Sequence, residues 1–237
     1  MGKRRLILLS MFVFLLVAAL SSFAGPAGAQ PDQLQFVVIY VELKPADTKA
    51  GDRLLDDLAA QALASAGVIR FDVLQQVDRS NFFALFEIWS SAQTFAAFQT
   101  SSATQAILTQ LTPLLGAPLD ERDGNLLAGT VDPRDAKSRI FVITHVDIDP
   151  QFIAPVDLAN PVLDTFVSDS LSDPGVQTFA LLSQTPTTNH FQLVEAFAKQ
   201  KAFDAHVSAQ HTLDFRNGIQ PFIGAPYDER LYQFANR

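Results

Sequence analysis

A nine-residue segment occurs twice in this chain, and this repeat constrains the fold more than any other feature of the sequence. Leu114–Arg122 reads LLGAPLDER, and Phe222–Arg230, 108 positions later, reads FIGAPYDER. The same offset pairs upstream residues without a gap: Gly67 with Gly175, Phe71 with Phe179, Asn81 with Asn189, Glu87 with Glu195, and Phe95 with Phe203. A period this long is that of a small domain and not of a solenoid repeat. The sequence therefore predicts two copies of one domain, here called copy one and copy two.

Residues 1–29 have the pattern of a secretory signal. A basic start at residues 3–5 precedes an apolar run from Leu6 to Leu20, and Ala27-Gly28-Ala29 supplies the small residues of a cleavage site. We expect cleavage between Ala29 and Gln30, export to the periplasm or the medium, and no stable membrane association afterwards. The alternative is an uncleaved anchor, because the apolar stretch approaches the length that spans a bilayer.

The composition of the mature chain excludes several classes of function. Removing the signal leaves 14 of the 17 basic residues against 25 acidic ones, a formal net charge of −11. Such a surface repels nucleic acid, so no nucleic-acid partner is expected. The chain has no cysteine, which excludes disulfides, thiolate metal sites and cysteine nucleophiles.

Each copy has the hydrophobic pattern β-α-β-β-α-β, the ferredoxin-like α+β arrangement with helices on one face of an antiparallel sheet. We expect copy one at 30–123, a linker at 124–138 and copy two at 139–237. The central strands are apolar on both faces, and helices can cover only one face. The other face is expected to pack against the sheet of the second copy, forming an α+β barrel within one chain and a cavity between the sheets.

The segment from Glu195 to His211 resembles antibiotic biosynthesis monooxygenase (ABM) domains. Such domains typically carry a Glu on the third strand, then an aromatic or Leu, then two His five residues apart, as in EAFAKQKAFDAHVSAQH here. The resemblance implies a dimeric α+β barrel, with one chain standing in for two. Some members are oxygenases of quinols or phenols that use no cofactor, and others are isomerases, haem degraders or proteins without a known reaction.

The four histidines of the chain all lie in copy two, which is therefore expected to hold the working site. At the positions of His206 and His211, copy one has Phe98 and Ala103. A neutral imidazole is a suitable base near pH 7. We predict His206 or His211 as the base that deprotonates a phenol or quinol, with Glu195 orienting it or binding a substrate hydroxyl. The alternative for both histidines is a structural role at a helix end.

A second set of residues is predicted to contact the substrate, each with a structural alternative. A buried carboxylate needs partners or a raised pKa, so Glu87 is either a catalytic acid or base at the substrate or a structural acceptor of backbone hydrogen bonds. Trp89 is either part of the core or cavity wall or a dedicated substrate platform. The strand residue His145, which could reach the cavity from the sheet, is either a core residue or a base. The predicted substrate-contacting residues are Tyr40, Glu87, Trp89, His145, Asn189 and Phe197.

The function predicted from the sequence is an exported, cofactor-independent monooxygenase. It would act with dioxygen on a small aromatic or quinone-like molecule held between the sheets. No cofactor and no metal are expected, because an ion could join His206 and His211 only if the helix broke between them. The alternatives are a protein that binds a small ligand without catalysis, and an isomerase. Exposed sheet edges would also permit a homodimer.

Overall fold

The structure confirms the α+β fold class and the barrel of two ferredoxin-like copies. In this computed structural model, residues 33–132, 138–153 and 157–235 are described. The predicted signal and its cleavage site lie outside these ranges. No helix among the described residues is long and apolar enough to cross a membrane.

The elements of copy one follow the predicted order. The apolar pattern predicts central strands at 69–77 and 82–89 in copy one and at 176–182 and 190–197 in copy two. In copy one the structure has them at 68–76 and 82–89. The elements are β1 (Gln35–Glu42), η1 (Pro45–Asp47), α1 (Thr48–Leu63), β2 (Val68–Gln76), β3 (Phe82–Trp89), α2 (Ala92–Thr100), α3 (Ser102–Leu111), η2 (Thr112–Leu114) and β4 (Asp120–Thr130).

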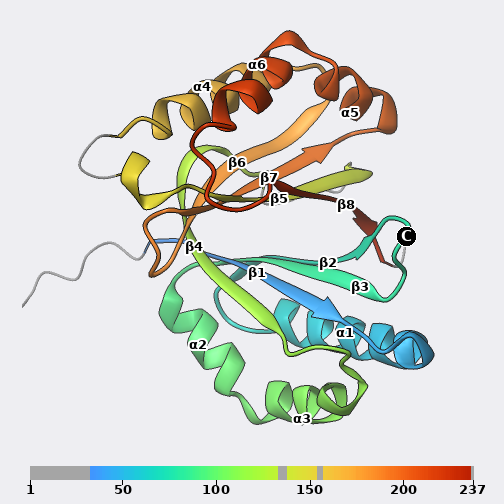
Figure 1. Ribbon diagram of the computed structural model, residues 1–237. Helices are drawn as coiled ribbons and strands as arrows, with labels where there is room; N and C mark the ends of the chain where they lie inside the picture. Colours follow the sequence, from blue (N-terminus) through green and yellow to red (C-terminus); the bar gives the residue numbers. More distant parts are fainter. Residues whose placement is uncertain (1–32, 133–137, 154–156, 236–237) are drawn as a thin grey trace, which may run out of the picture. The chain divides into compact units, whose positions relative to one another are not determined.

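Copy two repeats this order. Its strands and helices are β5 (Ile140–Asp147), η3 (Pro150–Phe152), α4 (Asn160–Ser170), β6 (Val176–Gln184), β7 (His190–Phe197), α5 (Gln200–Val207), α6 (Gln210–Ile219) and β8 (Asp228–Phe234). Helices α1–α3 flank one side of the strands and α4–α6 the other (Figure 1).

The last strand of each copy crosses to the other copy and closes the barrel. Strand β4 pairs with β1 and with β6 of copy two, and β8 pairs with β5 and with β2 of copy one. The barrel order is β1-β3-β2-β8-β5-β7-β6-β4, so each of these strands has neighbours on both sides. The sheet edges that would have permitted association are therefore absent among the described strands. In addition, β4 occupies residues 124–130, which the sequence had placed in the linker.

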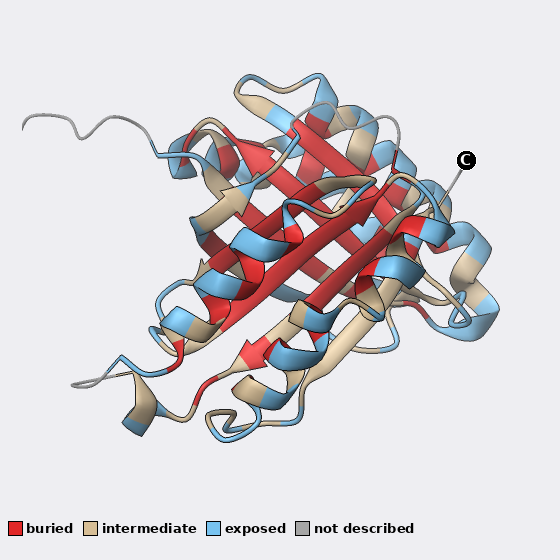
Figure 2. Cartoon of the chain, turned by 90° about the horizontal axis from the view of Figure 1, so that it is seen from above, coloured by how far each residue is buried: buried red, intermediate tan, exposed pale blue. Residues whose placement is uncertain are grey.

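Alternation along the strands separates two kinds of core, and the strands are the most buried part of the chain (Figure 2). One face of the strands points into the barrel, where the interior core gathers residues of both copies, among them Phe36, Phe86, Phe141, Val194 and Tyr232. The other face packs against the helices of its own copy, in one core for copy one and two clusters for copy two. Large side chains thus occupy much of the space between the sheets.

Gly67 and Gly175 hold equivalent turns before the second strand of each copy. Their φ angles are +84° and +92°, a region that side chains with a Cβ rarely adopt. Each glycine carbonyl accepts a hydrogen bond from the residue that follows the third strand, Ser90 at 2.7 Å and Ala198 at 2.8 Å. The repeated glycine therefore reflects a backbone requirement, not a ligand site.

Candidate active site in copy two

The predicted site residues lie on two different faces of the barrel wall. Glu195 and Phe197 on β7 share the helix-facing side with the core of copy two, and Glu87 and Trp89 take the same side of β3 in copy one. His145, in contrast, alternates with helix-facing residues of β5 and points into the barrel. The sequence predicts one substrate between the sheets, in contact with all of these residues. The acids and the histidine pair lie instead between sheet and helices.

A break between two helices brings His206 and His211 together. Helix α5 ends at Val207 and α6 starts at Gln210, and the Thr212 hydroxyl donates to the His206 carbonyl at 2.7 Å across the break. The two imidazole centroids are 5.6 Å apart. A continuous helix would have turned these side chains away from each other.

Asp173 joins the two histidines, and sequence reasoning missed it. Its Oδ2 lies 2.8 Å from His206 Nδ1, in a hydrogen bond, and 3.1 Å from His211 Nε2, at ion-pair distance. The angle at His211 does not make a hydrogen bond, so its Nε2 lacks a hydrogen-bond partner among the described residues. The repeat could have indicated Asp173. Copy one has Ser65 at the equivalent position, so the aspartate, like the two histidines, occurs only in copy two.

Glu195 lies behind His206 in a closed, polar part of the helix–sheet interface. Its Oε2 is 3.7 Å from His206 Nε2. Burial raises the pKa of Glu195 well above its usual value, and the nearby Glu229 raises it further. Burial lowers the pKa of His206, although Asp173 partly offsets this by stabilising the charged form. Both shifts favour the uncharged forms, a protonated acid beside a neutral imidazole.

His211 borders an open groove between α4 and α6 with a volume of about 500 Å³. The rings of Phe166 and Phe215 stack there at 3.9 Å between centroids. His206, in contrast, is 3 % exposed, and the narrow space around it and Glu195 is too small for a water molecule. Of the two predicted bases, only His211 is therefore placed to meet a ligand in the groove. The groove is lined by Pro161, Val162, Thr165, Phe166, Asp169, His211, Asp214, Phe215 and Gly218.

Copy one fills the equivalent place with aromatic side chains. Trp89 stacks on Phe98 at 4.8 Å between centroids, and its Nε1–H donates to Glu87 Oε2 at 2.7 Å. Burial raises the pKa of Glu87 to about 8, although the Trp89 hydrogen bond opposes this shift. Both copies thus keep a buried acid on the third strand, and each supplies it with a different neighbour.

Asn189 has a structural contact that explains its presence. Its Nδ2 donates to the carbonyl of Ile148 at 2.8 Å, and Asn81 in copy one donates to Leu43 in the same way at 2.9 Å. Each bond ties the turn before the third strand to the end of the first strand. Phe197 is fully buried, with its ring 5.2 Å from that of His206. Neither residue lines the groove.

Tyr40 and His145 lie inside the barrel at one end. The guanidinium carbons of Arg122 and Arg230 are each 5.0 Å from the centre of the Tyr40 ring. Arg122 also reaches His145, with Nη1 and Nε2 3.2 Å apart. A pocket of about 190 Å³ opens at this end beside Tyr40, Arg230 and Tyr232. Among the pockets of the described residues, this small space is the one that corresponds to the predicted inter-sheet cavity.

Two groups of side chains in copy two bring metal-binding atoms together. They are Asp173 with His206 and His211, and Asp147 with His145 and His190, and within each group the ligand atoms lie within 4.8 Å of one another. The helix break fulfils the condition that the sequence analysis set for a shared ion at His206 and His211.

Comparison with known proteins agrees with this architecture. Residues 35–110 match the family antibiotic biosynthesis monooxygenase (ABM). No curated protein matches the chain. A "putative monooxygenase" from Fusobacterium nucleatum subsp. nucleatum has a similar structure, with a TM-score of 0.76 and 13% identity over 87% of this chain and 94% of that one.

Two further structures share the fold along most of their length. One is a "putative monooxygenase" from Lactobacillus acidophilus, with a TM-score of 0.67 and 10% identity over 86% of this chain and 95% of that one. The other is an anthrone oxidase-like protein, with a TM-score of 0.65 and 13% identity over 86% of this chain and 91% of that one. At such identities these likenesses establish the fold alone. Copy one contains an ABM domain, and the two copies together form the α+β barrel of these monooxygenase-like structures.

Proposed function

We propose that this protein is an exported monooxygenase that uses no cofactor and oxidises a small aromatic or quinol-type substrate in the groove between α4 and α6. The observation that carries the proposal is His211, which lies at an apolar groove of about 500 Å³ with its Nε2 directed at Asp173. The ABM match of copy one and the likeness to an anthrone oxidase-like protein support this reaction class.

The groove suits a flat aromatic ligand better than the space between the sheets does. Its volume is typical of pockets for small molecules, and its walls combine stacked phenylalanines with a few polar groups. The pocket at the end of the barrel has less than half that volume, and its lining includes the charged side chains of Glu42, Asp120 and Arg230. The substrate is therefore assigned to the helix side of copy two.

In the proposed reaction His211 removes a proton from an acidic phenol or from a methylene activated by an aromatic ring. Neutral imidazole is a suitable base for this step. The Asp173 carboxylate stabilises the imidazolium that forms. The substrate anion supplies all the electrons that reduce dioxygen. For a methylene, one oxygen atom becomes the new carbonyl and the other leaves as water with the two hydrogens of the methylene. For a phenol, one oxygen atom becomes the second carbonyl of a quinone and the other leaves as water with the hydroxyl hydrogen and one ring hydrogen.

His206 and Glu195 are positioning residues in this scheme, because both are buried away from the groove. His206 holds the Asp173 carboxylate by a hydrogen bond of 2.8 Å. Glu195 lies behind His206, and its raised pKa favours the uncharged acid on that side of the imidazole. The carboxylate thereby keeps its direction toward His211.

The test is oxygen uptake by the mature protein with a panel of anthrones, quinols and catechols. His211→Ala should lower kcat/KM by about 10²–10⁴-fold, as removal of a general base does. Lys201→Ala, at an exposed position of α5 in the same copy, is the control and should keep full activity.

Other outcomes separate the alternatives. If calorimetry detects binding of a panel compound but neither oxygen uptake nor product is observed, the protein binds a small ligand without catalysis. Product formed under anaerobic conditions would identify an isomerase.

Export is proposed from the sequence of residues 1–29 and needs its own test. In a cell fractionation of the native host, the protein should be found outside the cytoplasm, and mass spectrometry should identify Gln30 as its first residue. A chain that keeps residues 1–29 and sediments with membranes would instead support the anchor.

A further inference from the structure

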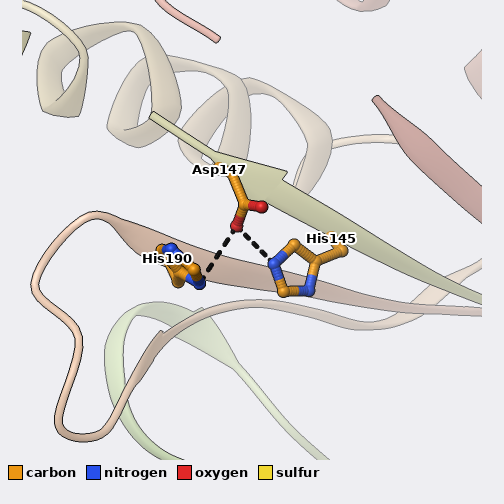
Figure 3. A group of neighbouring side chains, drawn as sticks. All are labelled: His145, Asp147 and His190. Carbon is orange, nitrogen blue, oxygen red and sulfur yellow. Dashed lines mark hydrogen bonds and ion pairs between the residues drawn. The ribbon is translucent and has the colours of Figure 1, made fainter. Parts of the chain in front are cut away.

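A second group of two histidines and one aspartate lies at the end of the barrel, apart from the proposed active site. His145, Asp147 and His190 turn their polar atoms toward one another (Figure 3). His145 Nε2 contacts Asp147 Oδ1, and His190 Nδ1 lies 3.3 Å from the same oxygen. One carboxylate oxygen therefore lies between two imidazole nitrogens.

The sheet itself produces this arrangement. Asp147 and His190 are directly opposite each other in the antiparallel pair of β5 and β7, so their side chains take the same face. His145 precedes Asp147 by two residues and shares that face as well. The three side chains therefore converge at strand positions, which hold their Cα atoms more firmly than loops would.

The two nearby arginines are each bound to another aspartate, although Arg122 also interacts electrostatically with Asp147. Arg122 is bound to Asp120 by Nε and Nη2, with the Nη2 contact at 2.8 Å, and Arg230 is bound to Asp228 by two contacts of 3.0 and 2.5 Å. Each guanidinium thus has an aspartate of its own. Asp147 adds a further negative charge at this end of the barrel, which favours a bound cation.

The contacts of His145 do not determine which of its ring nitrogens carries the proton. This nitrogen faces both Asp147 Oδ1 and Arg122 Nη1, the latter at 3.2 Å. A single ring nitrogen cannot donate to the carboxylate and accept from the guanidinium at once, so one contact is unsatisfied in either tautomer. His145 Nδ1 has no hydrogen-bond partner among the described residues, so no protein contact fixes the tautomer. The Nε2 lone pair can therefore face an ion.

The donor set and spacing fit a transition metal. Zinc is bound by imidazole nitrogen at about 2.0–2.1 Å and by carboxylate oxygen at about 2.0–2.2 Å, which places tetrahedral donors about 3.3 Å apart. The His190 and Asp147 donor atoms are 3.3 Å apart, whereas the His145 and Asp147 atoms are closer together and would have to separate for both to bind the ion. Beside them a hollow of about 270 Å³ is lined by Asp147, His190 and Asn189, and gives solvent a path to a fourth position.

We propose that His145, Asp147 and His190 form a site for one divalent transition-metal ion, of which Zn²⁺ is the type example. This site goes beyond the proposed oxygenase reaction and does not depend on it. Copy one lacks the set: Tyr40, Glu42 and Phe82 occupy the equivalent strand positions. Of these three only Glu42 is an ordinary zinc ligand.

The experiment is calorimetric titration of the untagged, metal-free mature protein with Zn²⁺. One ion per chain is expected to bind and to raise the melting temperature. His145→Tyr and His190→Phe introduce the residues that copy one accepts at these positions. Each should weaken binding by about 10–100-fold or more, because even the loss of an outer-sphere partner has that effect.

Co²⁺ provides a spectroscopic readout that a purely structural role would not change. Its visible absorption should show nitrogen and oxygen ligation in the native protein and lose that signature in both variants. Unchanged melting temperatures of the metal-free variants will show that they fold.

The matched control is His211→Ala, in the other histidine–aspartate group, which should bind Zn²⁺ like the native protein. The proposal is overturned if the native protein does not bind Zn²⁺ or if the His145 and His190 variants bind it as tightly. It is also overturned if His211→Ala is the variant that loses the ion.

Discussion

The two copies share one backbone plan and differ where the helices meet the sheet. In copy one Trp89, Phe98 and the buried acid Glu87 form an aromatic stack with one hydrogen bond. In copy two the equivalent volume contains His206, and His211 and Asp173 adjoin it. The strands, the turn glycines and the turn asparagines are the same in both. The comparison shows that this interface can change from apolar to polar without a change of fold.

The ABM match adds to this comparison, because residues 35–110 lie in the copy without the histidine pair. The family assignment therefore rests on residues that build the domain and does not depend on His206 or His211. Catalysis and family membership are separate questions in this chain. If only copy two is catalytic, copy one serves as the partner that completes the barrel.

The largest effect is expected from converting copy two to the pattern of copy one. The triple variant Asp173→Ser/His206→Phe/His211→Ala should lose about 10²–10⁴-fold in kcat/KM for oxygen uptake, because the base and its carboxylate are both removed. It should still fold, since copy one packs Ser65, Phe98 and Ala103 at these positions. Full activity of the folded triple variant would show that the difference between the copies is unrelated to catalysis.

Glu87→Gln is expected to change the pH dependence of stability. The folded pKa of Glu87 is about 8, above the usual 4.5, so the folded protein keeps a proton that the unfolded chain releases. This contribution is complete below pH 4.5 and is lost as the pH rises through about 8. At about 1.4 kcal/mol per pKa unit, the shift from 4.5 to about 8 corresponds to a loss on the order of 5 kcal/mol.

Urea unfolding of the native protein and of Glu87→Gln at pH 5, 7 and 9 measures this effect. The native protein should lose stability toward pH 9, and the variant should lose less. Parallel pH profiles would mean that Glu87 is ionised in the folded protein.

Trp89→Phe introduces the residue that copy two has at the equivalent position, Phe197. We expect a loss of about 2 kcal/mol in the free energy of unfolding, from a smaller ring and from a Glu87 oxygen left without its donor. Chemical denaturation followed by circular dichroism measures it. The reverse change, Phe197→Trp, should not recover that energy, because His206 and not Phe98 faces the ring in copy two. An unchanged free energy of unfolding in Trp89→Phe would show that the stack of Trp89 on Phe98 and its hydrogen bond to Glu87 do not stabilise the fold.

The smallest effects are expected at the two asparagines, where the copies should behave alike. Asn81→Ala and Asn189→Ala each remove one hydrogen bond to a backbone carbonyl, and each should cost about 1 kcal/mol. Melting temperatures report the loss, and oxygen uptake should be unchanged in both. A loss of oxygen uptake in Asn189→Ala but not in Asn81→Ala would show that Asn189 contacts the substrate, as the sequence predicts.

The limits of the strands within one copy were largely predictable from the sequence. The pairing of strands between the two copies was only partly predictable. The strands at 82–89 and 190–197 have the predicted limits because apolar residues on both faces mark a buried strand. The end of copy one was predicted too early: β4 runs on to Thr130 because its partner there, β6, belongs to copy two. No local pattern encodes a partner so distant in sequence.

By itself, the sequence determined the duplication, the β-α-β-β-α-β order, the need for a second sheet and the concentration of histidines in copy two. These properties follow from periodicity and from the internal repeat, which are local or directly comparable. The tertiary structure alone decided that β4 and β8 exchange between copies and that the helix break turns His211 to a groove. It also decided that Asp173 and Asp147 each stand between two histidines. Such contacts join residues from different elements, and their distances are set by the packing of the whole barrel.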